Sequence, residues 1–150
     1  MFRLSRKSQL ALEAVLDIAL HSRPDPVQSK EITERQGVPQ RYLEQVMQHL
    51  VHAGILKGVR GPRGGYRLAR ERRRITVGEI VRIVSELETN GSTEQESQSE
   101  LSYRVIRPLV DALEEEMMQR LEGITIEDLC RQAAGAGVSQ AGKSWADFTI

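Results

Sequence analysis

The chain has 150 residues, of which 21 are Lys or Arg and 21 are Asp or Glu, so its formal net charge is zero. This length suits one domain with a modest core and one further element. A single cysteine, Cys130, excludes an intramolecular disulfide, and no apolar run approaches membrane-spanning length. The apolar stretch from Leu10 to Leu20 is broken by Glu13 and Asp17, unlike a secretory signal. We therefore expect a cytoplasmic protein that does not enter a membrane.

The charges are unevenly distributed along the chain. Residues 1–75 carry 15 Lys and Arg against 7 Asp and Glu, whereas residues 76–150 carry 6 against 14. The first half could therefore face a polyanion such as nucleic acid, which the second half would repel. Two solvated surfaces of opposite sign would give the same counts, so the asymmetry alone does not decide between these interpretations.

Two helices are predicted at the start of the chain. Apolar residues recur at helical spacing from Ser8 to Ser22, which predicts a core helix. After the break at residues 24–26, Ser29 can cap a short helix that carries Glu31 in its first turn. Gly37 can supply the left-handed residue that ends this second helix.

A third helix, with one apolar and one polar face, is predicted next. Pro39 suits its first turn because the missing N–H would be unpaired there, and Gly54 ends it. The apolar face consists of Leu43, Val46, Met47, Leu50 and Val51. The polar face shows Gln40, Arg41, Glu44, Gln45 and Gln48. A short helix, a tight turn and such a second helix are typical of a helix-turn-helix, although many helical bundles have the same pattern.

The segment that follows favours a DNA-binding fold over a simple bundle. Ile55 to Val59 reads as a strand, residues 60–65 as a Gly- and Pro-rich tip, and Tyr66 to Leu68 as the returning strand of a hairpin wing. Only one acid, Glu71, accompanies its basic residues. These are Lys57, Arg60, Arg63, Arg67, Arg70, Arg72, Arg73 and Arg74. DNA phosphates would neutralise this charge through counterion release.

The second half is predicted to contain three helices. Thr76 and Glu79 form a capping box for a helix that we expect to pack on the wing strands. A polar loop over 89–100 follows, then a long helix from Leu101 to Leu121, which either starts near Arg107 or kinks at Pro108. Thr125 caps a last helix over 126–133.

The long helix carries an apolar stripe that one copy of so short a chain can scarcely cover. The simplest way to cover the stripe is the same helix of a second copy of the chain. We assign dimerisation to Ile106, Leu109, Leu113 and Met117. The expected fold is therefore mainly α with a small β-hairpin. It comprises a winged helix-turn-helix DNA-binding domain over 1–88 with the wing at 56–68, the loop over 89–100, the dimerisation helix and short C-terminal helix over 101–134, and a tail over 135–150.

The predicted contacts with double-stranded DNA come from three places. Gln40, Arg41 and Glu44 occupy the first turns of the third helix, where side chains reach base edges in the major groove. Arg60 and Arg63 at the wing tip would enter or straddle a minor groove. The candidates for phosphate positioning are Ser5, Lys7, Ser29 and Tyr42. Packing remains an alternative for Tyr42, as does a surface salt bridge for Glu44.

No residue pattern indicates catalysis or a metal site. Cys130 lies among apolar residues on a short helix, which is typical of a small buried side chain, although a sensing role stays open. His49 and His52 have no neighbouring Cys or carboxylate cluster to complete a site, and His21 closes the first helix. A nucleophile with a paired base and a phosphate-cradling glycine loop are both missing. We expect no enzyme activity, no metal and no cofactor.

The motifs resemble the Rrf family of bacterial winged-helix transcription regulators over residues 2–134. The resemblance rests on Arg3-Leu4-Ser5, the run 34–39, Tyr42-Leu43-Glu44-Gln45, the wing 59–66, Val77-Gly78-Glu79-Ile80 and Ile124-Thr125. It implies a homodimer whose long helices cross and whose winged helices read a palindromic operator. Family members regulate iron-sulfur assembly, cysteine metabolism or nitrosative stress.

The resemblance also implies a sensing site that this chain lacks. Many members hold an iron-sulfur cluster with three cysteines in the loop before the dimer helix, whereas Thr89 to Ser102 contains no Cys and no His. The chain is more similar to the clusterless, cysteine-metabolism type of member. We therefore expect a dimeric repressor in cysteine, iron-sulfur or redox-stress control. Its signal would be a small molecule, a protein partner or a cluster held by unusual ligands. The alternative is a winged-helix scaffold whose basic wing binds an acidic protein.

Overall fold

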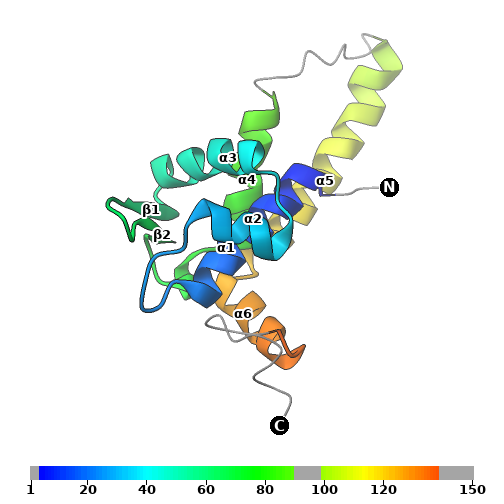
Figure 1. The fold of residues 1–150 in the computed structure, drawn as a ribbon. Coiled ribbons are helices and arrows are strands. Elements are labelled where there is room, and N and C mark those ends of the chain that lie inside the picture. The colour runs from blue at the N-terminus through cyan, green and yellow to red at the C-terminus, as the bar shows by residue number, and fades with distance from the viewer. Residues whose placement is uncertain (1–3, 90–98, 139–150) are drawn as a thin grey trace.

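The computed structural model describes residues 4–89 and 99–138 (Figure 1). Its elements are α1 (Arg6–His21), α2 (Ser29–Gln36), α3 (Gln40–His52), β1 (Leu56–Val59), β2 (Gly65–Leu68), the 3₁₀ turn η1 (Arg72–Arg74), α4 (Val77–Thr89), the π-helical turn η2 (Ser102–Ile106), α5 (Arg107–Glu122) and α6 (Ile126–Gly135). The prediction of a mainly helical fold with one small hairpin is confirmed. No helix among the described residues is long and apolar enough to cross a membrane.

The core is built around α1, which contacts α2, α3, α4, α6 and β2. Its inward face is completely covered at Ala11, Ala14, Val15 and Ile18, each 0% exposed. Ser5 begins the helix, and its hydroxyl oxygen accepts the Ser8 N–H at 3.1 Å. The predicted core helix is therefore confirmed, two residues longer at its start.

A buried carboxylate on α1 fastens the second helix. Asp17, only 1% exposed, accepts two hydrogen bonds from the Arg35 guanidinium at 2.7 and 2.9 Å and one from the Gln36 amide at 2.9 Å. Burial of a charge is favourable only when it is paired and hydrogen-bonded, as here. The contact holds the C-terminal end of α2 against α1, and so sets the turn that leads into α3.

The starts of α2 and α3 differ slightly from the predictions. Gln28, not Ser29, is the N-cap of α2, and its backbone N–H donates to the Glu31 carboxylate at 2.7 Å. Pro39, predicted in the first turn of α3, is instead its N-cap and lies one residue before the helix begins. Gly37 has the expected left-handed conformation, with φ of 69°. The turn between the two helices is therefore short, as a helix-turn-helix requires.

The hairpin pairs Leu56 with Leu68 and Val59 with Gly65 in antiparallel register. A single residue of the α1–α2 connection, Val27, extends the sheet, because its N–H donates to the Tyr66 carbonyl at 3.0 Å and its carbonyl accepts from the Tyr66 N–H at 2.7 Å. A β-carbon at Gly65 would collide with the Val27 backbone. Glycine at this position therefore permits the close approach that ties the wing to the body.

Helix α4 begins with the predicted capping box, in which the Glu79 N–H donates to the Thr76 hydroxyl at 3.2 Å and the Thr76 N–H donates to the Glu79 carboxylate at 3.1 Å. Its predicted packing on the wing strands is wrong. It lies mainly on α1 and also contacts α3 and α5. The reason is that its apolar residues, including Ile80 and Val84, complete the same core that α1 organises.

Two contacts fix the end of α5 to the start of α4. A β-carbon at Gly78 would collide with Glu122, so glycine allows the two helices to touch. The chain beyond α5 pairs with residues 75–77, since the Val77 N–H donates to the Ile124 carbonyl and the Ile126 N–H to the Ile75 carbonyl, both at 2.8 Å. Helix α6 is capped by Thr125, as predicted.

The helix that begins before α5 passes Pro108 without a break. The Arg107 N–H donates to the Ser102 carbonyl, five residues earlier, which makes this a π-helical turn. The π-helical turn ends just before Pro108, which has no backbone N–H to donate. This turn and the first part of α5 project away from the body (Figure 1). Residues 90–98 and 139–150 are outside the described residues, so most of the predicted loop over 89–100 and tail over 135–150 is not described.

Candidate nucleic-acid interface

The outer face of α3 is polar and exposed along its first turns. Gln40, Arg41 and Glu44 are all exposed, while Leu43, Val46, Met47 and Leu50 are buried on the opposite face. The Gln40 amide donates to the Glu44 carboxylate at 3.4 Å, a long bond that a competing base edge could replace. Within the described residues, Arg41 has no hydrogen bond or ion pair, so its guanidinium is available.

Half of the basic residues of the wing and the segment after it are already paired within the fold. Arg67 donates to the Ser22 and Pro24 carbonyls, both at 2.6 Å. Arg70 donates to Glu79 at 3.2 and 3.3 Å. The other two pairs, both at 2.5 Å, are Arg72 with Glu127 and Arg73 with Glu71. The expectation that all eight cations would await phosphate is therefore wrong for these four. Carbonyls of the α1–α2 connection, Glu79 of α4, Glu127 of α6 and the neighbouring Glu71 lie beside them.

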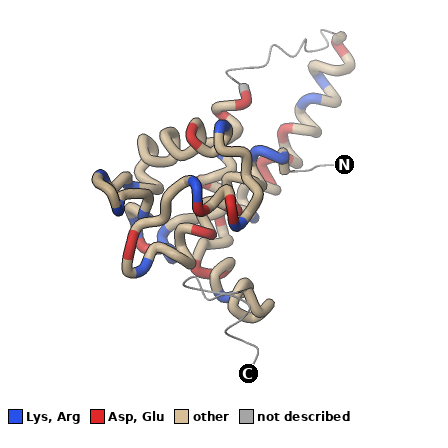
Figure 2. Tube along the Cα trace, viewed as in Figure 1, with Lys and Arg blue, Asp and Glu red and all other residues tan. Residues whose placement is uncertain are grey.

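The remaining four cations, Lys57, Arg60, Arg63 and Arg74, are exposed and have no ion pair with any described residue. Arg60 and Arg63 lie in the tip that joins β1 to β2, and Figure 2 shows basic residues at this end of the hairpin. Helix α3 contacts β1 directly, so the exposed face of α3 and the wing belong to neighbouring elements. The two unpaired cations of the wing tip, Arg60 and Arg63, thus belong to an element that neighbours the polar helix.

The candidates for phosphate positioning have different surroundings. Lys7 is exposed, whereas Ser5 and Ser29 are partly buried. The Ser5 hydroxyl donates to the Ser8 hydroxyl at 3.0 Å. The Tyr42 hydroxyl donates to the Lys7 carbonyl, and burial followed by the nearby Glu88 charge raises the pKa of Tyr42 to about 12. Tyr42 therefore joins the start of α3 to α1. Because its hydroxyl proton is donated to the Lys7 carbonyl, it is not available to a phosphate.

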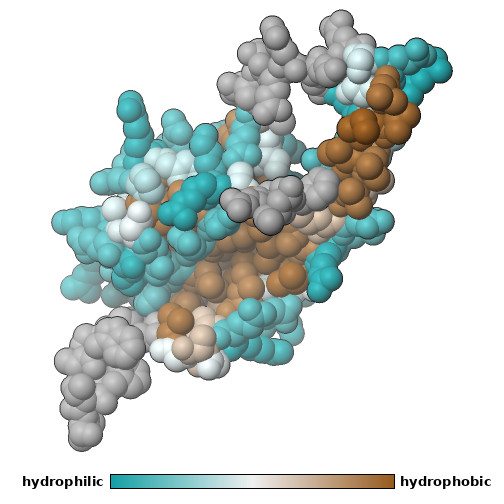
Figure 3. Space-filling model, turned by 90° about the vertical axis from the view of Figure 1, so that its right-hand side faces the viewer, coloured by the Kyte–Doolittle hydropathy of each residue, from teal (hydrophilic) through white to brown (hydrophobic). Residues whose placement is uncertain are grey.

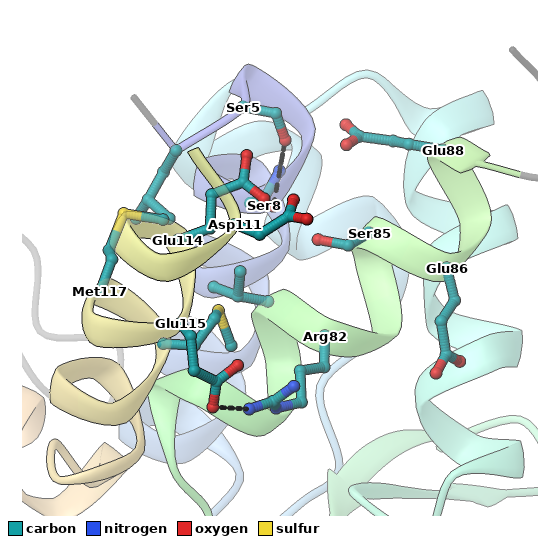
Figure 4. A pocket seen from close by; sticks show the side chains of 13 residues that line it. Ser5, Ser8, Arg82, Ser85, Glu86, Glu88, Asp111, Glu114, Glu115 and Met117 are labelled. Atoms are coloured by element: carbon teal, nitrogen blue, oxygen red, sulfur yellow. Dashed lines mark hydrogen bonds and ion pairs between the residues drawn. The ribbon is translucent and has the colours of Figure 1, made fainter. Parts of the chain in front are cut away.

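The face formed by α4 and α5 has the opposite sign. A pocket of about 610 Å³ between α1, α4 and α5 is lined by several carboxylates, and Asp111 and Glu114 lie near Ser8 and Ser85 (Figure 4). Arg82 donates to Glu122 at 2.6 Å and lies 3.9 Å from Glu115, which joins α4 to α5. Phosphates would be repelled here, so this face is disfavoured as a nucleic-acid interface.

The predicted dimer residues fall into two groups. Ile106, Leu109 and Leu113 are 48%, 55% and 38% exposed, and Figure 3 shows apolar atoms along the projecting helix. Leu101 and Val105 extend this exposed apolar face and were not singled out by the sequence. Met117 differs because it is partly buried and lines the acidic pocket against α1 and α4.

Sequence reasoning also missed the role of Asp17. The signal was available, since Leu10, Ala14 and Asp17 recur at spacings of four and three on the buried face of α1. A charged residue on an apolar stripe indicates a buried partner. Its identity, Arg35, could not be read from periodicity.

Two solved structures are similar over nearly the whole chain. The T. potens IscR structure is 34% identical, covers 93% of this chain and 93% of that chain, and superposes with a TM-score of 0.72. The structure of CymR, described as the global cysteine regulator of B. subtilis, is 30% identical, covers 88% of this chain and 98% of that chain, and has a TM-score of 0.64.

Among curated proteins, the HTH-type transcriptional regulator IscR of Photobacterium profundum is 46% identical over 84 residues, which are 56% of this chain and 49% of that protein. The IscR of Vibrio cholerae is 45% identical with the same coverage. The chain thus spans about half the length of the curated relatives it matches. These relatives are transcriptional regulators and not enzymes.

The profile of the Rrf2 family, described as iron-dependent transcriptional regulator, matches residues 4–132. The donors among the described residues do not fit an iron centre. Cys130 is 3% exposed, and burial raises the pKa of its thiol, which disfavours the thiolate that binds metal. No group of three His, Cys, Asp or Glu in the described ranges could hold a metal ion. The match nevertheless spans most of the sequence, and the chain belongs to the Rrf2 family of transcriptional regulators.

Proposed function

We propose that the protein is a homodimeric, sequence-specific DNA-binding regulator that represses transcription. The observation that carries the proposal is the concentration of unpaired cations at the wing tip, Arg60 and Arg63, beside the exposed polar face of α3. Four other cations of this region, Arg67, Arg70, Arg72 and Arg73, are paired inside the fold, whereas the two at the tip remain available to a polyanion. The family and the names of the relatives support the same function.

Within this interface the contacts divide into reading and holding. Gln40 suits adenine, Arg41 suits guanine and Glu44 can accept from cytosine, so the first turns of α3 read the major groove. Arg60 and Arg63 follow the backbone or the adjacent minor groove. Lys7, Ser5 and Ser29 supply weaker phosphate contacts at the edges. Tyr42 positions α3 through its bond to Lys7 and leaves phosphate binding to its neighbours.

Dimerisation would cover the exposed apolar face of the projecting helix. Ile106, Leu109 and Leu113 lie at its centre, and Met117 lies at its edge, where α5 returns to the body. An isologous contact between two such helices would place two winged helices about a two-fold axis, which matches a palindromic operator. The apolar face has no covering element among the described residues, which is the feature that calls for a second copy.

The regulated genes are proposed from the relatives alone. IscR and the cysteine regulator CymR are the named neighbours, which supports control of cysteine, iron-sulfur or redox-stress functions. The donors within residues 4–89 and 99–138 do not fit an iron centre, so we propose a small molecule or a protein as the signal.

Salt-dependent DNA binding tests the proposal. Affinity for a random duplex is measured by fluorescence anisotropy at two salt concentrations, for the wild type, for Arg60→Ala with Arg63→Ala, and for Lys30→Ala as an exposed-cation control on α2. We expect a steep log-log dependence that becomes shallower by about two units in the double variant, since each lost phosphate contact removes roughly 0.9. Binding that is insensitive to salt, or equal loss in the control, would contradict DNA as the partner.

A further inference from the structure

A basic pocket lies apart from the α3 surface. It encloses about 630 Å³ between the C-terminal end of α1, the hairpin, the segment 70–73 and the start of α6. It is lined by six cations, which are Arg23, Lys57, Arg67, Arg70, Arg72 and Arg73. Only two acids, Glu71 and Glu127, accompany them, so the lining carries an excess of four positive charges. No residue of α2 or α3 contributes to it.

The cations of this pocket differ in how many of their hydrogen-bond donors are already paired within the protein. Arg67 and Arg70 are held by carbonyl groups and Glu79, and they build the wall. Arg73 contacts Glu71 through Nε, which leaves its terminal N–H groups without a described partner. Arg23 and Lys57 are exposed and form no ion pair within the described residues. Three cations on three different segments therefore retain donors for an anion.

Apart from Ser22, the rest of the lining is apolar. Ala19, Leu20 and Leu68 are partly buried and belong to the same pocket. A volume of about 630 Å³ lies within the range of sites that hold small organic molecules, which combine apolar walls with a few polar groups. Cationic donors from several directions suit the tetrahedral oxygens of a phosphate group, whose charge-assisted hydrogen bonds are strong.

We propose that this pocket binds a small phosphorylated molecule. Its phosphate is held by Arg23, Lys57 and Arg73, and its organic part lies against Leu20 and Leu68. The assignment goes beyond DNA recognition, because α3 takes no part in the pocket. A phosphate of a DNA backbone has the same chemistry, so the test must separate the two sources.

The probe is pyrophosphate, titrated by calorimetry without DNA at constant ionic strength. The variants are the wild type, Arg23→Ala with Lys57→Ala, and a charge-matched control, Lys30→Ala with Arg104→Ala, whose cations lie on α2 and η2. We expect saturable binding of about one pyrophosphate per chain. It should weaken by at least about tenfold in the pocket variant, because two charge-assisted contacts are lost, and stay within about twofold in the control. Since both pocket residues are exposed and unpaired, the thermal melting curves should be unchanged.

Absence of saturable binding to the wild type would overturn the proposal, as would equal weakening in the control. A second arm measures affinity for a random duplex. If the pocket variant loses duplex affinity while the wild type ignores pyrophosphate, the pocket holds DNA backbone and the small-molecule assignment is wrong. Pyrophosphate binding is read without DNA, so a failure of the proposed regulatory function would not hide the result.

Discussion

Replacing Leu109 with Glu tests the proposed dimer at the most exposed of its four predicted contact residues. The side chain is 55% exposed in the protomer, more than Ile106 at 48% or Leu113 at 38%. Complete burial of a leucine is worth about 1.5–3 kcal/mol, so covering the exposed part of Leu109 gains about 1–1.5 kcal/mol in each chain. Two-fold symmetry doubles this to about 2–3 kcal/mol, or roughly 30- to 150-fold in the dissociation constant. A glutamate adds the cost of burying two like charges, so the loss should exceed this range.

Sedimentation equilibrium at micromolar concentration measures the effect. The wild type should sediment as a dimer and Leu109→Glu as a folded monomer with an unchanged helical circular dichroism spectrum. Val138→Glu is the matched control, because Val138 is 50% exposed and lies beyond α6, away from the proposed interface. Operator binding should weaken in the Leu109 variant alone, since paired half-sites can then no longer be engaged together.

Two results would refute this reasoning. A monomeric wild type at micromolar concentration would mean that the apolar face of α5 has another partner. A dimeric Leu109→Glu protein would mean that the two copies associate through a different surface.

Three further predictions concern DNA recognition, stability and titration. Arg41→Ala should cost about 1–3 kcal/mol on the operator and relax preference at one position per half-site, whereas Arg60→Ala should weaken operator and random duplex alike in anisotropy titrations. If Arg60→Ala weakens only operator binding, the wing reads sequence. Asp17→Asn should lower the free energy of unfolding in urea by about 1.5–3 kcal/mol through the lost charge-assisted bonds with Arg35, while the exposed control Glu13→Gln should change it by less than about 0.5; equal effects would show that the buried pair is unimportant. Because the folded state raises the pKa of Tyr42 from 10.0 to about 12, the stability from its neutral form is complete below about pH 10 and is lost as the pH rises towards 12. Tyr42→Phe should remove the last tyrosinate absorbance step, and a late step that persists in this variant would belong to another tyrosine.

The predictions that held depend on neighbours a few residues apart. The capping box of Thr76 and Glu79 and the cap at Thr125 each join groups three residues apart, so the residue types alone indicate them. Gly37 ends α2 because the left-handed conformation favours glycine at any helix end. The spacing of apolar residues likewise predicts α1 and α3, because helical periodicity is a property of the local chain.

Other features depend on groups that only the folded chain brings together. Asp17 and Arg35 are 18 residues apart, and Arg67 and Ser22 are 45 residues apart, so no local pattern pairs them. The same holds for α4. Its apolar stripe could pack on either a helix or a sheet, and we predicted the wing strands, whereas it packs mainly on α1. Apolar burial is non-directional, and periodicity therefore shows which face is buried but not against what.

The wing shows most clearly which part of the functional site cannot be predicted from the sequence. The sequence by itself determined that a hairpin rich in Lys and Arg follows a helix-turn-helix, because turn residues and formal charges can be counted along the chain. It could not determine which cations remain free. Only the tertiary structure places Glu79 beside Arg70 and Glu127 beside Arg72, and leaves Arg60 and Arg63 exposed. The physical reason is that Coulomb energy falls with distance, so the charge offered to a partner depends on contacts between segments and not on composition.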